Sequence, residues 1–255
     1  MGEGSHLSGG GTTMKILERT EPLPKSKSPN SNWNSYYGDD KYAVPEFIDN
    51  ALWRNYRAVL RKHIKHNKPL RVLELGGANS CYFKRFCEDF NIENYTIVDN
   101  NQTGLDRFPY KDDPRVMTYC LDLLDNPPET LIADYDIVLS SGLIEHFVPE
   151  ETLRIVDYHF KAAKPGGLVL LSFPTPTIVY WAFRKFLEKT GQFPPLFERP
   201  ITVSESERFK SLENDKLEQF NIWSTILTQL LLLYRKGSSP FLTQEFKAFQ
   251  GFWIK

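Results

Sequence analysis

Five apolar segments of strand length, separated by segments with helical spacing, constrain the fold more than any other feature of this chain. The apolar segments are 70–75, 94–99, 115–122, 135–141 and 168–174. Segments 79–90 and 149–163 show helical periodicity, and 102–107 could form a short helix. Strands that alternate with helices pair in parallel through right-handed crossovers. The sequence therefore predicts an α/β fold with a doubly wound, mostly parallel sheet.

The first four apolar segments end in small or polar residues. These endings are Gly76-Gly77, Asp99, Asp122 and Ser140-Ser141. Open α/β sheets bind ligands beyond the carboxyl ends of their strands, so these residues are expected to surround one site. Each ending alone has a structural explanation: a tight turn, a solvated aspartate or a helix cap. The ordered set of four indicates a ligand site.

The residues at this edge favour a ligand that contains a nucleoside. The stretch Gly76-Gly77-Ala78 lets the backbone approach a ligand closely. Asp99 follows Glu74 by 25 positions (99 − 74 = 25), and an acid at the end of the second strand can accept both ribose hydroxyls. Asp122 is placed to accept from an adenine amino group, with Leu123 covering the ring.

The glycine turn disfavours a dinucleotide ligand. The dinucleotide fingerprint requires glycine at positions 76, 78 and 81, whereas the chain has Gly76, Ala78 and Cys81. The sequence also lacks a phosphate loop with Gly-Lys followed by Ser or Thr. A nicotinamide-dependent oxidoreductase is therefore the weaker alternative.

Composition excludes several classes of partner. The chain is 41% hydrophobic and 25% charged, with a net charge of −1, so it has no basic field to recruit nucleic acid or an anionic membrane. No apolar stretch is long enough to span a bilayer, and 222–234 is interpreted as a buried amphipathic helix. Three cysteines without scaffold spacing indicate reduced thiols and a cytoplasmic protein.

The chain divides into five segments by composition and periodicity. We expect a flexible leader at 1–32, an N-terminal helical or lid segment at 33–66 and the sheet core with the ligand site at 67–174. A helical substrate cap is expected at 175–240, and the final strand of the sheet at 241–255. Within the cap, helices are predicted at 176–190 and 213–235, with no clear strand. Residues 241–255 alternate like a strand and are expected to lie antiparallel at an edge.

Five motifs carry a resemblance to a known family. In chain order they are VLELGGANS, IVDNN, CLDLLD, YDIVLSSGLIEHF and KPGGLVLLSFP. Together they resemble the class I S-adenosylmethionine-dependent methyltransferases over roughly residues 70–175 and the last strand. The resemblance implies a Rossmann-like sheet of seven strands whose last strand is antiparallel. It also implies S-adenosylmethionine as the cofactor, S-adenosylhomocysteine as its product, and an enzyme that methylates a small molecule such as a sugar or natural-product intermediate.

The resemblance assigns roles to individual residues. Glu74, with Gly76, Gly77 and Ala78, would hold the amino-acid part of the cofactor, and Asp99 would hold the ribose. Asn100, Asp122 and Leu123 would surround the adenine. Ser140 and Ser141 would line the methionine part. Tyr37 is the preferred lid residue over the cofactor. Ala78 and Ser80 stand where many relatives have glycine, so a tightened pocket is expected.

His146 is the candidate general base. It follows the fourth apolar segment, near the expected methyl position, and a histidine can take a proton near neutral pH. The alternative is a structural or cofactor-shielding role, because a Glu-His pair at this place recurs in the family. Glu145 and His146 are not expected to bind a metal, since no third ligand is evident nearby.

The acceptor is left open by the sequence. Relatives that methylate nucleobases carry an Asx-Pro-Pro-aromatic motif where this chain has SSGL, so a base-modifying enzyme is disfavoured. Transfer to oxygen, nitrogen or carbon remains possible on the sequence alone. A second hypothesis is a non-catalytic partner subunit with the same fold, and a titration with S-adenosylhomocysteine and NAD separates these alternatives.

Overall fold

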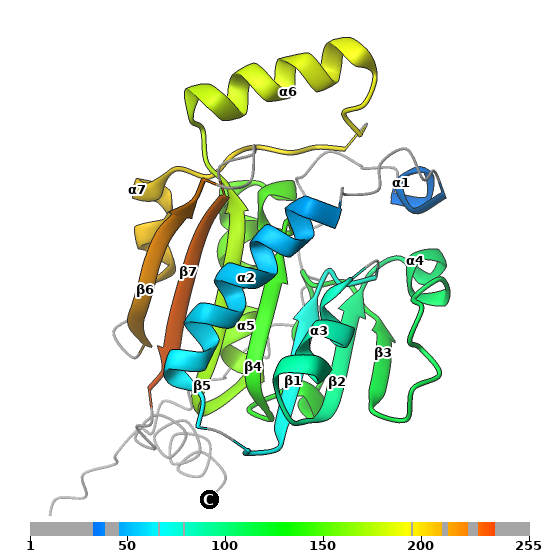
Figure 1. The fold of residues 1–255 in the computed structure, drawn as a ribbon, viewed down its shortest axis with the longest axis vertical. Helices are drawn as coiled ribbons and strands as arrows, with labels where there is room; N and C mark the ends of the chain where they lie inside the picture. Colours follow the sequence, from blue (N-terminus) through cyan, green and yellow to red (C-terminus); the bar gives the residue numbers. More distant parts are fainter. Residues whose placement is uncertain are drawn as a thin grey trace, which may run out of the picture.

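The computed structural model describes residues 33–38, 46–65, 67–78, 80–194, 196–210, 214–223 and 229–237. Within them lies a seven-stranded sheet in the order β3-β2-β1-β4-β5-β7-β6 (Figure 1). The strands are β1 (Leu70–Leu75), β2 (Ile92–Asp99), β3 (Val116–Cys120), β4 (Tyr135–Ser141), β5 (Ala163–Pro174), β6 (Asn214–Ile222) and β7 (Gln229–Lys236). Of these seven strands, β7 alone runs in the direction opposite to the other six. The predicted α/β fold, with one antiparallel strand, is confirmed.

Helices cover both faces of the sheet (Figure 1). Helices α2 (Glu46–His63) and α3 (Tyr82–Asp89) pack on one face, and α5 (Pro149–Ala162) packs on the other. Helix α2 has acids in its first turn and bases in its last, which favours the helix dipole. The shorter elements are α1 (Trp33–Gly38), α4 (Gln102–Asp106), α6 (Ile178–Thr190), α7 (Val203–Ser206), η2 (Glu129–Leu131), η3 (Ile144–His146) and η4 (Glu207–Phe209).

Alternate side chains of the central strands fill two separate cores. Val72 of β1 packs with residues of α2 and α3, whereas its neighbour Leu73 packs with residues of α5. Both side chains are fully buried, and burial of each contributes about 1.5–3 kcal/mol. Because both faces are covered, the parallel strands are continuous apolar runs in the sequence.

The register of the strands brings their carboxyl ends to one edge of the sheet. Leu75 of β1 lies beside Val98 of β2, and the Gly76 N–H donates to the Val98 carbonyl over 2.8 Å. On the far side of β2, the Leu121 N–H donates to the Asp99 carbonyl over 3.0 Å. The four polar strand endings predicted to surround a site therefore share this edge, which is the upper end of the strands in Figure 1.

The region assigned to a helical cap contains two strands. Helix α6 agrees with the prediction for 176–190, but the helix predicted over 213–235 is wrong, because β6 and β7 occupy this segment. The same correction applies to the buried helix expected at 222–234. The four leucines of 230–233 form a run without the periodicity of either element, and short apolar runs are ambiguous between helix and buried strand.

The position of β7 explains its composition. It lies between β5 and β6 within the sheet, and both of its faces are buried because a hydrophobic core packs on each side of the sheet. Leu231 and Leu233 contribute to the core beneath α2, and Leu230 and Leu232 contribute to the core beneath α5. The antiparallel strand expected at 241–255 is thus supplied earlier in the chain, and 241–255 itself lies outside the described residues.

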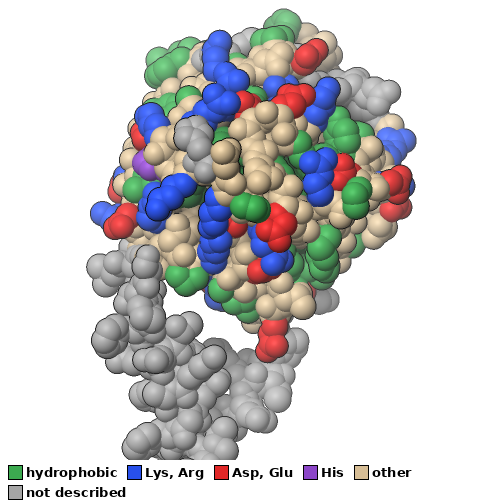
Figure 2. Space-filling model, turned by 60° about the horizontal axis from the view of Figure 1, so that its bottom comes forward, with side chains coloured by type: hydrophobic (Ala, Val, Ile, Leu, Met, Phe, Trp, Pro, Cys, Tyr) green, Lys and Arg blue, Asp and Glu red, His purple; other side chains and the backbone are tan. Residues whose placement is uncertain are grey.

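Charges of both signs are interspersed over the face shown in Figure 2, which brings the lower end of Figure 1 forward. The buried Asp136 of β4 is neutralised by two lysines, because its Oδ1 pairs with Lys68 at 2.8 Å and with Lys164 at 2.5 Å. Among the described residues, no helix combines the length and apolarity needed to cross a membrane.

Candidate functional site

The turn after β1 has no room for side chains at two glycines. Gly76 has a φ of +72°, and a Cβ there would lie 2.7 Å from Cδ1 of Leu143. A Cβ on Gly77 would lie 2.8 Å from the carboxyl carbon of Glu74. Positive φ and close backbone approach are the two conditions that require glycine. The turn therefore leaves backbone N–H groups at the carboxyl edge of the sheet, next to a buried acid.

Glu74 is buried beneath this turn. The Tyr95 hydroxyl donates a hydrogen bond of 2.5 Å to its Oε2. Burial raises the pKa of Glu74 to about 7, although hydrogen bonds from Ser80 and Tyr95 oppose the shift. Near neutral pH this carboxyl group can therefore both accept and donate hydrogen bonds.

Asp99, at the end of β2, is the most thoroughly bonded carboxylate at this edge. Its Oδ2 accepts from the Ala78 N–H at 3.2 Å and from the Tyr37 hydroxyl at 3.1 Å, and its Oδ1 accepts from the Asn101 N–H at 2.9 Å. Burial raises the pKa of Asp99, and these hydrogen bonds counteract that rise. The carboxylate thus joins the glycine turn to the start of α4.

Helix α1 lies across the carboxyl edge of the sheet, beside α4 (Figure 1). The Asn101 side-chain amide donates to Oδ1 of Asn34 over 2.7 Å, and Arg107 donates to the Tyr37 carbonyl. The Trp33 ring meets the His146 ring edge-on at 4.9 Å between centroids. Helix α1 therefore links the end of β2 to the loop after β4.

His146 lies in η3, the short helical turn that follows β4. Its Nδ1 is 2.6 Å from the Phe197 carbonyl oxygen. A carbonyl only accepts, so Nδ1 carries the proton, and the neutral ring has its lone pair on Nε2. Burial lowers the pKa of His146, opposed by hydrogen bonding to the Phe197 and Gly142 backbones and by the charge of Glu198, and the lowered pKa favours the neutral ring. The arrangement gives a histidine whose Nε2 is able to accept a proton.

The remaining candidates have their own protein partners. Asp122 is exposed, and its Oδ1 accepts from the Leu124 N–H at 2.9 Å, as a turn aspartate does. The Ser140 hydroxyl lies 2.9 Å from Nε2 of the buried His159. The Ser141 hydroxyl accepts from the Tyr56 hydroxyl at 2.9 Å. These two neighbouring serines point to opposite faces of the sheet.

The sequence predicted no contact at this edge for Asn101, for Arg199 or for the backbone of Phe197, whose ring was a candidate for the acceptor pocket. Asn101 caps α4 by accepting from the Gly104 N–H at 2.8 Å, and an Asn before a short helix is a signal that could have found it. Phe197 and Arg199 reach the loop after β4 from the segment that follows α6. No local pattern marks these two residues, because their contacts span about fifty positions.

Comparisons with known proteins bear on the fold. No family model matches the chain, and no curated protein matches it. Among solved structures, it is similar to a 1,6-didemethyltoxoflavin N1-methyltransferase from Burkholderia thailandensis with bound S-adenosylhomocysteine, at a TM-score of 0.58 and 17% identity, over 80% of this chain and 85% of that one. The fold is that of the class I methyltransferases.

Two further methyltransferases support this conclusion. The N-methyltransferase NodS from Bradyrhizobium japonicum, with S-adenosylhomocysteine, matches at a TM-score of 0.55 and 12% identity, over 80% of this chain and 95% of that one. A magnesium protoporphyrin IX methyltransferase from Synechocystis, also with S-adenosylhomocysteine, matches at a TM-score of 0.53 and 16% identity, over 80% of this chain and 93% of that one. The likeness confirms the methyltransferase fold that the sequence motifs implied.

In this methyltransferase fold, the predicted residues separate into two groups. Glu74, the glycine turn, Asp99 and Tyr37 form one contiguous cluster at the carboxyl edge. By contrast, Leu123 and the Ser140 side chain lie in the core on the α5 side. Asn100 is exposed directly after Asp99. The described residues hold no group of three or more His, Cys, Asp or Glu side chains that could bind a metal ion.

Proposed function

We propose that this protein transfers a methyl group from S-adenosylmethionine to a small-molecule acceptor. The observation that carries the proposal is Asp99, a buried carboxylate at the end of β2 whose Oδ2 accepts from the Ala78 N–H of the glycine turn over 3.2 Å. Such an acid beside such a turn suits a ribose with its attached groups. The structures with the same fold that were solved with S-adenosylhomocysteine support this cofactor.

The donor set at the edge fits the cofactor. Glu74, with its pKa of about 7, and the backbone of residues 76–78 would bind the amino-acid part. Asp99 would bind the ribose hydroxyls. Asn100, Asp122 and Leu123 would frame the adenine, and the Ser140-Ser141 backbone would line the methionine part. When bound, the cofactor supplies an electrophilic methyl group, so the protein mainly contributes proximity and alignment.

Tyr37 must change partners for this binding to occur. An ionised carboxylate has about four acceptor sites. Tyr37, Ala78 and Asn101 donate hydrogen bonds to three of them, and an Asn100 N–H bond also lowers the pKa of Asp99. Three of these donors are backbone groups of the sheet edge. The Tyr37 hydroxyl is the donor that can leave without unfolding the turn, so α1, which carries it, would act as a lid.

His146 would be the general base for an acceptor hydroxyl or amine. The proton of the acceptor would pass to Nε2, because Nδ1 already holds a proton that is bonded to the Phe197 carbonyl. The lowered pKa favours the neutral ring, which is the form that can accept a proton. A neutral amine acceptor needs less help than a hydroxyl, so the loss of turnover without His146 would be larger for oxygen acceptors.

Isothermal titration calorimetry with S-adenosylhomocysteine tests the cofactor proposal. We expect binding to the wild type and at least about tenfold weaker binding to Asp99→Asn, because hydrogen bonds to a charged group contribute about 1.5–3 kcal/mol. Asp106→Asn is the matched control, since its carboxylate is exposed on α4 and bonds to Gln102. Absence of wild-type binding would refute the proposal, and binding of NAD instead would favour an oxidoreductase.

A second experiment separates an enzyme from a non-catalytic partner subunit. The wild type and His146→Gln would be incubated with S-adenosylmethionine and panels of small hydroxyl and amine acceptors, with methylated product detected by mass spectrometry. Turnover by the wild type that is reduced in His146→Gln, at unchanged S-adenosylhomocysteine affinity, supports the base. Equal turnover by both proteins would leave His146 with a structural role only.

A further inference from the structure

A strap, defined here as residues 196–210 after α6, crosses the loop that carries His146. Its backbone makes two contacts with that loop. The Arg199 N–H donates to the Glu145 carbonyl over 3.0 Å, and the Phe197 carbonyl accepts from Nδ1 of His146 over 2.6 Å. The strap therefore fixes which nitrogen of His146 holds the proton, provided that its own position is fixed.

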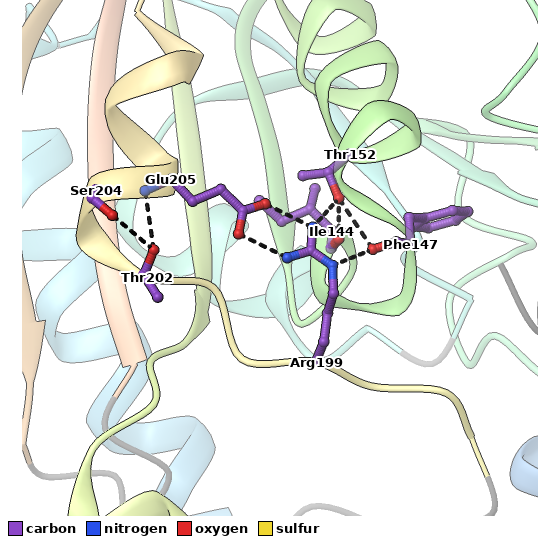
Figure 3. A network of polar contacts seen from close by, with 7 residues as sticks. All are labelled: Ile144, Phe147, Thr152, Arg199, Thr202, Ser204 and Glu205. Atoms are coloured by element: carbon purple, nitrogen blue, oxygen red, sulfur yellow. Dashed lines mark hydrogen bonds and ion pairs between the residues drawn. The ribbon is translucent and has the colours of Figure 1, made fainter. Parts of the chain in front are cut away.

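The Arg199 side chain supplies that fixation (Figure 3). Its Nε donates to the Phe147 carbonyl over 2.6 Å, and Nη2 donates to the Thr152 hydroxyl over 2.8 Å. The Thr152 hydroxyl in turn donates to the Ile144 carbonyl over 3.0 Å. Phe147, directly after η3, is thus bonded to the guanidinium, and Ile144, at the start of η3, is linked to it through the Thr152 hydroxyl.

The charge of Arg199 is balanced within the strap. Its Nη1 donates to Oε2 of Glu205 over 2.8 Å, and Nη2 forms an ion pair with Oε1 at 2.8 Å (Figure 3). Glu205 belongs to α7, where its N–H donates to the Thr202 hydroxyl over 3.1 Å. Only a planar guanidinium can serve a carboxylate, a carbonyl and a hydroxyl together in this way.

We propose that Arg199 is a positioning residue that holds the 144–147 loop against the strap and so keeps the His146 ring with its proton on Nδ1 and its lone pair on Nε2. The role of Nε2 as a base rests on the proposed function. The fixed tautomer does not, because it follows from the contact with Phe197. Without Arg199, the loop and the strap lose their shared anchor, and the ring gains freedom to exchange tautomers.

The first measurement is ¹⁵N NMR of the histidine ring nitrogens in the purified chain, at a pH where the rings are neutral. We expect His146 in the wild type to be a single Nδ1–H tautomer, and Arg199→Met to show a mixture. Arg208→Met is the matched control, because Arg208 is an exposed arginine of the same strap. Thr152→Val removes only the hydroxyl link, so it should produce a smaller fraction of the second tautomer than Arg199→Met does. It is the test variant if Arg199→Met fails to fold.

The second measurement separates positioning from general stability. S-adenosylhomocysteine affinity, measured by calorimetry, should change by less than about threefold in Arg199→Met, while kcat should fall by roughly tenfold to a hundredfold once an acceptor is known. Arg199→Lys should recover part of kcat, since it restores charge without the planar fork.

Failure of this inference is distinct from failure of the proposed function. A single Nδ1–H tautomer that persists in folded Arg199→Met and in Thr152→Val overturns the positioning role, whatever the activity. Absence of S-adenosylhomocysteine binding to the wild type overturns the proposed function, while the tautomer measurement still decides whether Arg199 holds the ring.

Discussion

The hydroxyl of Tyr37 donates a hydrogen bond of 3.1 Å to Oδ2 of Asp99, and thereby joins α1 to the end of β2. The sequence singled out both residues for the same site, one as a lid and one as a ribose acceptor. In the structure they bind each other. Asp99 is consequently engaged by the protein itself at the position where a ligand hydroxyl would bind.

Replacement of Tyr37 by Phe should strengthen cofactor binding. The variant keeps the ring but removes the donor that competes for Oδ2 of Asp99, so the affinity for S-adenosylhomocysteine should rise several-fold in calorimetry. Tyr110→Phe is the control, because the Tyr110 ring packs on Phe83 and Phe108 away from this contact. Weaker binding by Tyr37→Phe would instead mean that the hydroxyl contacts the bound ligand.

Substitution of Gly77 by Ala should destabilise the fold. The added Cβ would lie 2.8 Å from the Glu74 carboxyl carbon, and overpacking of this kind costs about 1–3 kcal/mol. Chemical denaturation measures the loss, and Gly38→Ala, with no atom within 4 Å of its Cβ, is the control. In a Glu74→Ala background the penalty should shrink, because the clashing group is gone. An unchanged penalty there would place the strain elsewhere.

His159 should make the protein sensitive to acid. Burial lowers the pKa of this fully buried histidine to about 4, opposed by its hydrogen bond to the Ile155 carbonyl. Between pH 6.5 and 4 the unfolded chain therefore binds more protons at this residue than the folded chain does. Its contribution to stability is complete above about pH 6.5 and is lost as the pH falls, by about 3 kcal/mol in all.

The variant His159→Gln isolates this contribution. The free energy of unfolding of the wild type should fall by about 3 kcal/mol more than that of His159→Gln between pH 7 and pH 4. Titration of Glu74, whose pKa is raised to about 7, has the opposite sign but cancels in the difference. His63→Gln, on the partly exposed end of α2, is the control. Parallel curves for wild type and His159→Gln would contradict the prediction.

Truncation of neighbouring leucines tests the strand assignment of β7. Leu231 and Leu232 are fully buried in the two different cores, so each Leu→Ala change should cost about 2–5 kcal/mol in the free energy of unfolding. The exposed Gln219 of the neighbouring β6 gives a matched control as Gln219→Ala. A large loss at only one leucine would indicate an element with one buried face.

The parallel half of the sheet could be predicted from the sequence, whereas β6 and β7 could not. Segments 70–75 and 135–141 alternate with helical patterns that set them apart, and their polar endings mark the site edge. The leucine run of β7 carries no period, because its packing partners in the cores on the two sides of the sheet bury both of its faces. Its identity as a strand depends on those partners, which local sequence does not specify.

The candidate site divides in the same way. Asp99 and Gly77 follow strands directly, so their place at the edge was predictable. The hydrogen bonds of Arg199 to Phe147 and Thr152 join residues about fifty positions apart, and nothing in the intervening sequence encodes them. The direction of the Ser140 side chain, towards His159, depended on the exact strand register.

Among the strands that the structure describes, β3 and β6 lie at the two margins of the sheet. On β6, Lys216 pairs with Glu207 at 2.7 Å, and Glu218 pairs with Lys62 at 3.2 Å. Charged side chains on a margin strand oppose the addition of a strand from another molecule, since intermolecular pairing would strip them of water. The uncharged leucines of β7 lie one strand inward, where no second chain can reach them. The placement of this hairpin therefore protects the most apolar segment of the protein from self-association.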